Sequence, residues 1–147
     1  MRIELLSWDR ARVKASPIRF EVFVTEQHVP AELELDEFDP HCVHALAYDV
    51  AGEAVGTGRL LPVEVEAGRK VSHIGRMAVR RSWRGKGVGA ALLRALMGAA
   101  RERGDEEIVL TAQVHALGFY RLHGFSAEGG EYLEAGIPHQ TMRCTLD

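Results

Sequence analysis

A basic and glycine-rich segment at residues 84–89 is the part of the chain best suited to binding an anion. Its sequence, RGKGVG, combines three glycines with two cationic side chains: Gly85, Gly87, Gly89, Arg84 and Lys86. If a helix begins at these glycines, the N–H groups of its first turn have no partner within the helix and lie at the positive end of the helix dipole. Glycine lets an anion approach such groups closely because it has no Cβ. The segment therefore predicts a turn that binds a phosphate or pyrophosphate, with a solvated basic turn as the alternative.

Two other nucleotide-binding motifs fit this segment less well. A nucleotide triphosphate loop requires GxxxxGK followed by Ser or Thr, and this segment has no such hydroxyl to hold magnesium. The dinucleotide fingerprint GxGxxG/A matches at Gly85, Gly87 and Ala90, with Asp105 about twenty residues later. However, the residues RRSWR separate that match from the apolar run that ends at Val79, and too little chain follows to complete a doubly wound nucleotide-binding fold.

The hydrophobic pattern places this turn between a strand and a helix. Apolar residues at helical spacing predict a helix at residues 87–103, which ends at Gly104. Further helices are predicted at residues 17–27, where Pro17 suits a first turn, and at residues 116–123. Strands are predicted at residues 2–6, 44–49, 54–61, 71–79, 107–114 and 136–146, and an acidic loop at residues 29–41. This order predicts an α/β fold in which a mixed sheet carries helices on its faces.

Length and composition narrow the class of protein. The 147 residues suit a single domain, residues 1–147, with a core that needs no metal or disulfide. Cys42 and Cys144 lie far apart in the sequence and are expected to be reduced thiols of a cytoplasmic protein. Neither a signal peptide nor a membrane-spanning run is expected.

Nucleic-acid and metal partners are also not expected. The net charge is −3, and the basic cluster at residues 76–86 has a single aromatic residue, Trp83, which is too few for a row of base-stacking side chains. The run HCVH at residues 41–44 offers metal-binding side chains, but no second cluster completes a tetrahedral site. The anion that the glycine turn binds is therefore expected to belong to a small molecule.

Two motifs together resemble a known family. The pattern R-x-x-G-x-G at Arg84, Gly87 and Gly89, between MAV and the predicted helix, resembles the pyrophosphate-binding motif of the GNAT superfamily of N-acetyltransferases. The stretch AQVHALGFYRLHGF at residues 112–125 is similar to that family's second motif, and the predicted elements follow the family's order along the whole chain. VFVTEQHVPAELELDEFD and GIPHQTMRC resemble a bacterial branch of largely uncharacterised substrate. The resemblance implies the acyl-CoA N-acyltransferase fold, with a mixed, mostly antiparallel central sheet flanked by helices on both faces.

The resemblance also implies that acetyl-CoA is the acyl donor. In this family the pantetheine arm pairs with the strand before the glycine turn as an added strand would, which corresponds here to the backbone of Met77, Ala78 and Val79. The pyrophosphate is then expected at residues 84–89, which include Val88. Further contacts of coenzyme A are expected in the second motif, at Ala116 and Phe119.

Tyr120 and His139 are the residues expected to take part in the reaction. Tyr120 matches the family's usual general acid, which protonates the departing thiolate, and its alternative role is packing beside Phe119 and Phe125. A primary amine must lose a proton before it attacks, and a histidine can relay protons near neutral pH. His139 is therefore the second catalytic candidate, with a surface histidine at a strand edge as its alternative. The sequence does not identify the general base.

Acidic residues after the first predicted helix are candidates for contact with the acceptor. Glu26, Glu32 and Asp36 lie in a region that borders the acceptor site of the resembled family, and their carboxylates would favour a cationic amine. A solvated acidic loop is the alternative. The sequence thus predicts an N-acetyltransferase that acts on a small primary amine by direct attack in a ternary complex. A non-catalytic acyl-CoA-binding module is the alternative function, and a homodimer stays open.

Overall fold

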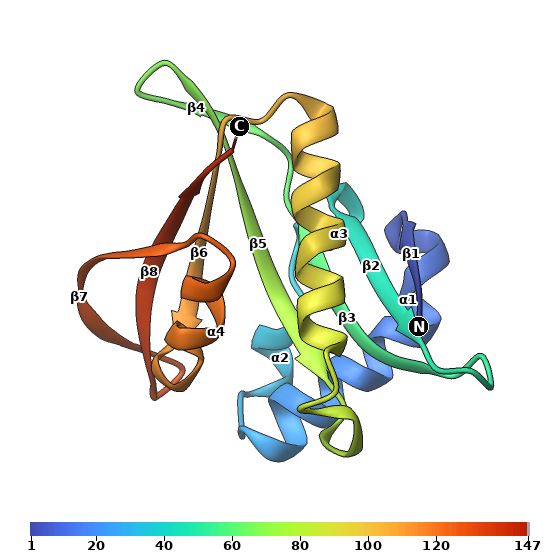
Figure 1. Ribbon diagram of the computed structural model, residues 1–147. Helices are drawn as coiled ribbons and strands as arrows, with labels where there is room; N and C mark the ends of the chain where they lie inside the picture. The colour runs from blue at the N-terminus through green and yellow to red at the C-terminus, as the bar shows by residue number, and fades with distance from the viewer. Residues whose placement is uncertain (147) are drawn as a thin grey trace.

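Within residues 1–146, which the computed structural model describes, eight strands form one mixed sheet (Figure 1). The strands are β1 (Arg2–Leu6), β2 (Val43–Tyr48), β3 (Ala54–Leu60), β4 (Glu64–Glu66), β5 (Arg69–Val79), β6 (Glu107–Gln113), β7 (Ser126–Glu134) and β8 (Ile137–Thr145). They follow the order β1-β2-β3-β5-β6-β8-β7, and β4 pairs with β5 beside this path. Neighbouring strands are antiparallel except β5 and β6, which are parallel. The predicted mixed, mostly antiparallel sheet is therefore confirmed.

Helices cover both faces of the sheet, as predicted (Figure 1). They are α1 (Trp8–Arg19), the π-helix η1 (Phe20–Glu26), α2 (Ala31–Glu34), α3 (Val88–Arg103) and α4 (Leu117–Leu122), with short 3-10 helices η2 (Asp39–His41), η3 (Arg81–Trp83) and η4 (Val114–Ala116). Successive side chains of a strand point to opposite faces. In β2, Leu46 therefore packs with Ala11 of α1, whereas Ala45 belongs to the core cluster that contains Leu92 of α3.

The parallel strands β5 and β6 are paired over only part of their length. Their ladder joins Val71, Ser72 and His73 of β5 to three residues that begin at Glu107 of β6. Beyond this ladder the two strands diverge, and Figure 1 shows the opening between the arrowheads of β5 and β6. Because β5 leads through η3 into α3, and β6 leads through η4 into α4, the predicted motifs lie at the two sides of this opening.

The first helix begins at Trp8, so the predicted start at residue 17 is wrong. Ser7 occupies the N-cap with an extended backbone, and Ala11 and Ala15 are fully buried one helical turn apart. Pro17 consequently lies inside α1 and not in its first turn. Small residues made the apolar face of α1 inconspicuous in the sequence, which explains the misplaced boundary.

Two strands and several short helices, among them α2, η2 and η3, are absent from the sequence-based prediction. β4 and β7 are exposed along most or all of their length, so they lack the alternation of apolar and polar residues that marks a half-buried strand. The segment predicted as an acidic loop contains α2 and η2, and Glu34 and Asp39 within it are buried. The prediction of a fully solvated loop is therefore wrong for these two carboxylates.

Candidate active site

The opening between β5 and β6 contains a cavity of about 680 Å³. Its walls come from the end halves of both strands, from η1 and α2 on one side, and from α4 and the β7–β8 hairpin on the other. The volume lies in the range of small-molecule sites. Segments that are distant in sequence thus meet around one hollow, which makes it the candidate active site.

β5 is bulged where it borders this cavity. Thr57 of β3 pairs with Ala78, whereas Arg59 pairs with Gly75, so β5 has one more residue than β3 between the two pairs. Arg76 lies within the bulge and has a φ of 52°, which is rare for a residue with a side chain. Such strain persists only where the surrounding structure enforces it, and it is common at functional sites.

The strand residues expected along the pantetheine arm all line the cavity. Met77 lies in the bulge beside Arg76, Ala78 and Val79 follow it, and all three belong to the cavity wall. Gly58 on β3 makes room for the first of them, because a Cβ at Gly58 would lie 2.5 Å from Met77 Sδ. The structure therefore places this stretch of β5 at the cavity.

The glycine turn leaves the start of α3 without a side-chain cap. Gly87 is the N-cap, with φ 84° and ψ 6°, and Gly85 has a φ of 75°. The N–H of Ala91 bonds to the carbonyl of Gly87, so the preceding N–H groups of the first turn are available to an anion. A Cβ at Gly85 or Gly87 would meet no atom within 4 Å. Positive φ therefore requires these glycines, and the open first turn fits a pyrophosphate.

The other residues of the predicted pyrophosphate turn differ in their burial and in their contacts. Val88 is buried in the core, so only its backbone can meet a ligand. A Cβ at Gly89 would lie 3.6 Å from Phe119 Cζ, which is an ordinary contact. Lys86 is exposed, and its Nζ lies 5.1 Å from the ring centroid of Trp83.

Arg84 is held between the end of β5 and η1. Its Nε donates to the carbonyl of Val79 over 2.9 Å, and its Nη2 donates to the carboxylate of Glu26, 3.1 Å from Oε1. Arg81 Nε lies 3.8 Å from the same carboxylate. A predicted pyrophosphate contact and a predicted acceptor contact are thus ion-paired with each other.

Besides the predicted Glu26, the π-helix η1 supplies cavity residues that the sequence does not predict. Val22, Phe23 and Glu26 line the cavity, as does Gln27 directly after the helix. Gln113 at the end of β6 donates from Nε2 to Gln27 Oε1 over 2.8 Å, and so links the two sides of the cavity. π-Helices are rare and frequently occur at functional sites.

Tyr120 lines the cavity from α4 while its ring packs in the core. The ring contacts Phe119 and Phe125 in edge-to-face geometry, with centroids 5.0 Å and 5.9 Å away. Burial raises the pKa of the Tyr120 hydroxyl to about 12. The phenol therefore keeps its proton at neutral pH.

His139 lies on β8 with a second cavity residue beside it. Its Nδ1 donates to the carbonyl of Ile137 over 2.6 Å, because a carbonyl oxygen can only accept. This bond leaves Nε2 facing Glu134, whose Oε2 is 3.6 Å away. Glu134 pairs with Ile137 in the β7–β8 ladder, so Glu134 and His139 are diagonal neighbours on one face. Glu134 was not predicted as a site residue, because β7 itself was not predicted.

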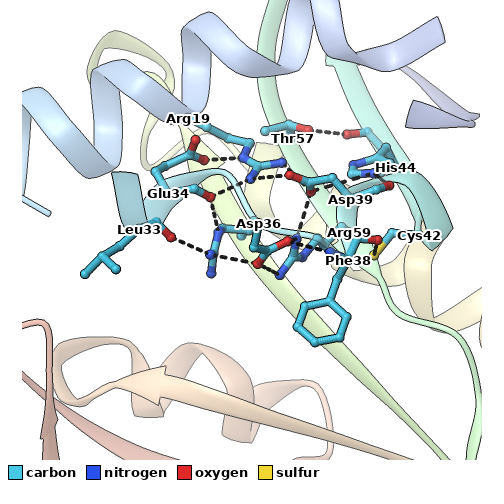
Figure 2. Close-up of polar contacts among 12 residues, drawn as sticks. Arg19, Leu33, Glu34, Asp36, Phe38, Asp39, Cys42, His44, Thr57 and Arg59 are labelled. Atoms are coloured by element: carbon cyan, nitrogen blue, oxygen red, sulfur yellow. Dashed lines mark hydrogen bonds and ion pairs between the residues drawn. The ribbon is translucent and has the colours of Figure 1, made fainter. Parts of the chain in front are cut away.

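Arginines of α1 and β3 form ion pairs with the acidic segment at residues 29–41 (Figure 2). Arg19 of α1 pairs with the carboxylate of Glu34, and its Nη1 donates to Asp39 Oδ1 over 2.8 Å. Arg59 of β3 donates to Asp39 over 2.8 Å and to both oxygens of Asp36 over 2.7 Å. Burial alone would raise the pKa of Asp36, but the hydrogen bond and charge of Arg59 hold it at about 2.

Arg76 connects this ion-pair cluster to the cavity. It lines the cavity, donates from Nε to the carbonyl of Glu34 over 3.1 Å, and donates from Nη2 to Asp36 Oδ2 over 3.1 Å. Asp36 itself lies outside the cavity wall and is paired with Arg59 and Arg76. Glu32 is exposed on α2. The acceptor contacts predicted at these two residues stay predictions.

The structure brings half of the predicted residues to the cavity wall. The lining residues are Glu26, Met77, Ala78, Val79, Arg84, Ala116, Tyr120 and His139. The other predicted residues lie outside the lining, in the glycine turn, on α4 and in the acidic segment: Gly85, Lys86, Gly87, Val88, Gly89, Phe119, Glu32 and Asp36. No helix within residues 1–146 is long and apolar enough to cross a membrane.

Comparison with known proteins identifies the family. Residues 11–146 match the model of the acetyltransferase (GNAT) domain. The chain is 40% identical over 126 residues to the uncharacterized N-acetyltransferase YjcF of Bacillus subtilis, an alignment that covers 85% of this chain and 86% of YjcF. An acyl-CoA N-acyltransferase from Pseudomonas aeruginosa superposes with a TM-score of 0.82 at 30% identity, covering 98% and 99% of the two chains. Escherichia coli ElaA gives 0.82 at 27% identity, covering 97% and 98%.

The protein belongs to the GNAT superfamily. It is an acetyl-CoA-dependent acyltransferase, as the sequence motifs predict. The alternative of a non-catalytic acyl-CoA-binding module is therefore set aside.

Proposed function

We propose that the protein transfers the acetyl group of acetyl-CoA to a small primary amine by direct attack in a ternary complex. The observation that carries this proposal is the cavity at the β5–β6 opening. It is bordered by residues 77–79 of β5, by Arg84 in the turn before α3, and by Tyr120 and His139. One hollow thus offers contacts for donor and acceptor together.

The donor side follows from backbone chemistry. The amides of the pantetheine arm pair with the backbone of Met77, Ala78 and Val79, where β5 has left its neighbour β6. The pyrophosphate binds at the first-turn N–H groups of α3, and Arg84 and Lys86 add positive charge there. The side chains of Ala116 and Phe119 belong to the same side of the site. Acetyl-CoA supplies a thioester whose carbonyl carbon is open to attack.

The acceptor reacts as the neutral amine. A free alkylamine is mostly protonated at neutral pH, so it must first transfer a proton to a base. The amine nitrogen then bonds to the thioester carbonyl carbon, and the carbon–sulfur bond breaks with its electron pair on sulfur. In this proposal His139 accepts the proton of the amine; the bond from Nδ1 to a carbonyl supports this role, because it leaves the lone pair of a neutral imidazole on Nε2.

Tyr120 assists the departing sulfur. A free thiol has a pKa near 8.5, well below the value of about 12 for Tyr120, so complete transfer of the phenolic proton to the thiolate is uphill. The main contribution of Tyr120 is therefore a hydrogen bond that stabilises the negative charge on sulfur as it develops. The thiolate gains its final proton from solvent or from the proton released by the amine.

Thiol release from acetyl-CoA, measured with a chromogenic thiol reagent, tests this proposal. Primary amines, secondary amines and alcohols of similar size are supplied at a fixed acetyl-CoA concentration, with a reaction lacking any acceptor as the hydrolysis background. We expect release above background with primary amines, and mass spectrometry should find the N-acetylated product. Release with alcohols alone, or binding of coenzyme A without turnover of any amine, would overturn the assignment.

A further inference from the structure

The cavity wall contains three carboxylates, and arginines neutralise two of them. Glu26 is paired with Arg84, and Glu34 is buried in its ion pair with Arg19. Among the cavity residues that the structure describes, Glu134 is the carboxylate that lies against a histidine, His139, instead of an arginine. The cavity therefore offers one accessible negative charge to a cationic acceptor.

When His139 is neutral, Glu134 and His139 present two acceptor atoms to each other. With Nδ1 bonded to the Ile137 carbonyl, a neutral His139 presents a lone pair at Nε2, and an ionised Glu134 also only accepts. Two acceptor atoms 3.6 Å apart attract a hydrogen-bond donor to their vicinity. An ammonium group supplies such donors together with the matching charge.

Apolar side chains form part of the remaining wall of the cavity, beside polar ones. Side chains from five separate segments contribute: Val22, Phe23, Leu33, Ile74, Leu110 and Ile137. Ile137 pairs directly with Glu134 in the β7–β8 ladder, so an apolar surface borders the carboxylate. An acceptor with an apolar body can bury it here and still present its amine to Glu134.

Among the described residues of the cavity wall, a second positive charge on the acceptor finds no carboxylate comparable to Glu134. The cationic side chains of the wall are Arg76, Arg81 and Arg84, and the nearby carboxylates are already bonded to arginines. A second ammonium group would leave water to face apolar residues or a like charge, both of which cost free energy.

We propose that the acceptor is a monocationic primary amine with an apolar body, and that Glu134 and His139 receive its ammonium group. This inference rests on the proposed acetyltransferase function and specifies its substrate class. Glu134 binds the ammonium form and determines specificity, and His139 takes the proton that the amine loses before attack.

Steady-state kinetics with three amines test the substrate class: phenethylamine, spermidine and phenylalanine. At saturating acetyl-CoA we expect kcat/KM to be highest for phenethylamine and at least tenfold lower for spermidine. Phenylalanine carries a carboxylate next to its amine, and repulsion by Glu134 should make it at least tenfold poorer as well. A preference for spermidine or for phenylalanine would overturn the proposal.

Variants of Glu134 test the residue assignment. Glu134→Gln should raise the KM for phenethylamine on the order of tenfold, at the low end for a charge-assisted hydrogen bond because Glu134 is exposed. The KM for acetyl-CoA should not change, and Glu134→Asp should restore part of the loss. The matched control is Glu131→Gln, which removes the same charge from an exposed position on β7 outside the cavity wall. Equal effects of the two Gln variants would overturn the role of Glu134.

Different results would contradict the proposed acetyltransferase function and the proposed acceptor class. If the wild-type protein binds coenzyme A but releases no thiol with any amine, both the proposed function and this inference are wrong. If amines react but their preference or the Glu134→Gln effect is contrary to expectation, only this inference is wrong.

Discussion

Arg84 Nη2 lies 3.1 Å from Glu26 Oε1, so the cation expected to bind pyrophosphate is already paired with a carboxylate of η1. The same guanidinium donates to the carbonyl of Val79 and is thereby fixed at the end of β5. The polyphosphate of coenzyme A must consequently either share Arg84 with Glu26 or displace that carboxylate.

Replacing Glu26 should strengthen coenzyme A binding. Glu26→Gln removes a negative charge near the expected phosphates and releases Arg84 from its ion pair, so the Kd for coenzyme A should fall about two- to fivefold at low salt. Calorimetric titration at two ionic strengths measures this effect, which should shrink at high salt. Glu21→Gln is the control, because Glu21 also lies in η1 but pairs with Arg80 and lies outside the cavity wall. Weaker binding to Glu26→Gln would mean that the carboxylate positions Arg84 productively.

Gly87 and Gly89 should respond differently to an added methyl group. Gly87→Ala forces a side chain into left-handed backbone at φ 84°, which disturbs the N–H groups of the turn, so the Kd for coenzyme A should rise about tenfold. Gly89→Ala adds a Cβ that makes only an ordinary contact with Phe119, and binding should change less than threefold. Isothermal titration compares the variants.

Gly52→Ala provides the control for backbone strain. Gly52 also has a φ of 84° and open space around a Cβ, but it lies in the turn between β2 and β3. It should lose about as much thermal stability as Gly87→Ala and bind coenzyme A normally. A Gly87→Ala variant with unchanged affinity would contradict a pyrophosphate site at the start of α3.

Tyr120→Phe should lower turnover without weakening donor binding. The ring still packs against Phe119 and Phe125, so the Kd for acetyl-CoA should stay within about twofold, while kcat falls about 10- to 100-fold with the loss of the hydrogen bond to sulfur. Pre-steady-state kinetics isolate the chemical step from product release.

The pH profile gives a second check on Tyr120. Because its pKa is raised to about 12, ionisation of the phenol should produce no loss of activity below about pH 11. Tyr48→Phe is the control, since burial also raises the pKa of Tyr48 to about 12 and Tyr48 packs with α1 away from the cavity. A wild-type rate for Tyr120→Phe would leave Tyr120 with a packing role only.

Asp36 should make stability depend on pH in the acid range. Its pKa is about 2 in the folded protein, against an ordinary value of 3.8, so the folded state holds the proton less tightly than the unfolded state. The carboxylate therefore stabilises the fold fully above about pH 5, and this contribution is lost as the pH falls towards 2. Urea denaturation should show Asp36→Asn to be less stable than the wild type at pH 6, with the difference shrinking near pH 2. Glu37→Gln, an exposed neighbour, should show no such trend.

The strand–turn–helix unit around the glycine turn is the part of the fold that sequence predicts best. Leu92 and Leu96 repeat at helical spacing, and Gly104 ends α3 in left-handed backbone, so local signals and tertiary packing agree. In α1 the buried face consists mainly of alanines, whereas Pro17 gives a strong local signal that points to the wrong position.

Strand register and long-range ion pairs determine the parts of the site that sequence does not predict. Glu134 reaches His139 across the turn of the β7–β8 hairpin, and β7 has no local pattern of apolar and polar residues that would predict this hairpin. Likewise, the partners of Glu34 and Asp39 are Arg19 and Arg59, which no short motif connects to the acidic segment. Carboxylates in a predicted loop therefore say little about the charge that a ligand meets.

The divergence of β5 and β6 also bears on strand pairing between molecules. An open strand edge normally lies at the rim of a sheet, where it can pair with another molecule and nucleate aggregates. Here two such edges face each other in the interior of one sheet, beyond the pair His73 and Val109. One extra extended chain between two strands needs roughly 10 Å, twice the ordinary strand spacing. A slender amide-bearing arm can enter that gap, whereas the edge of another folded sheet arrives with its neighbouring strands and is kept out.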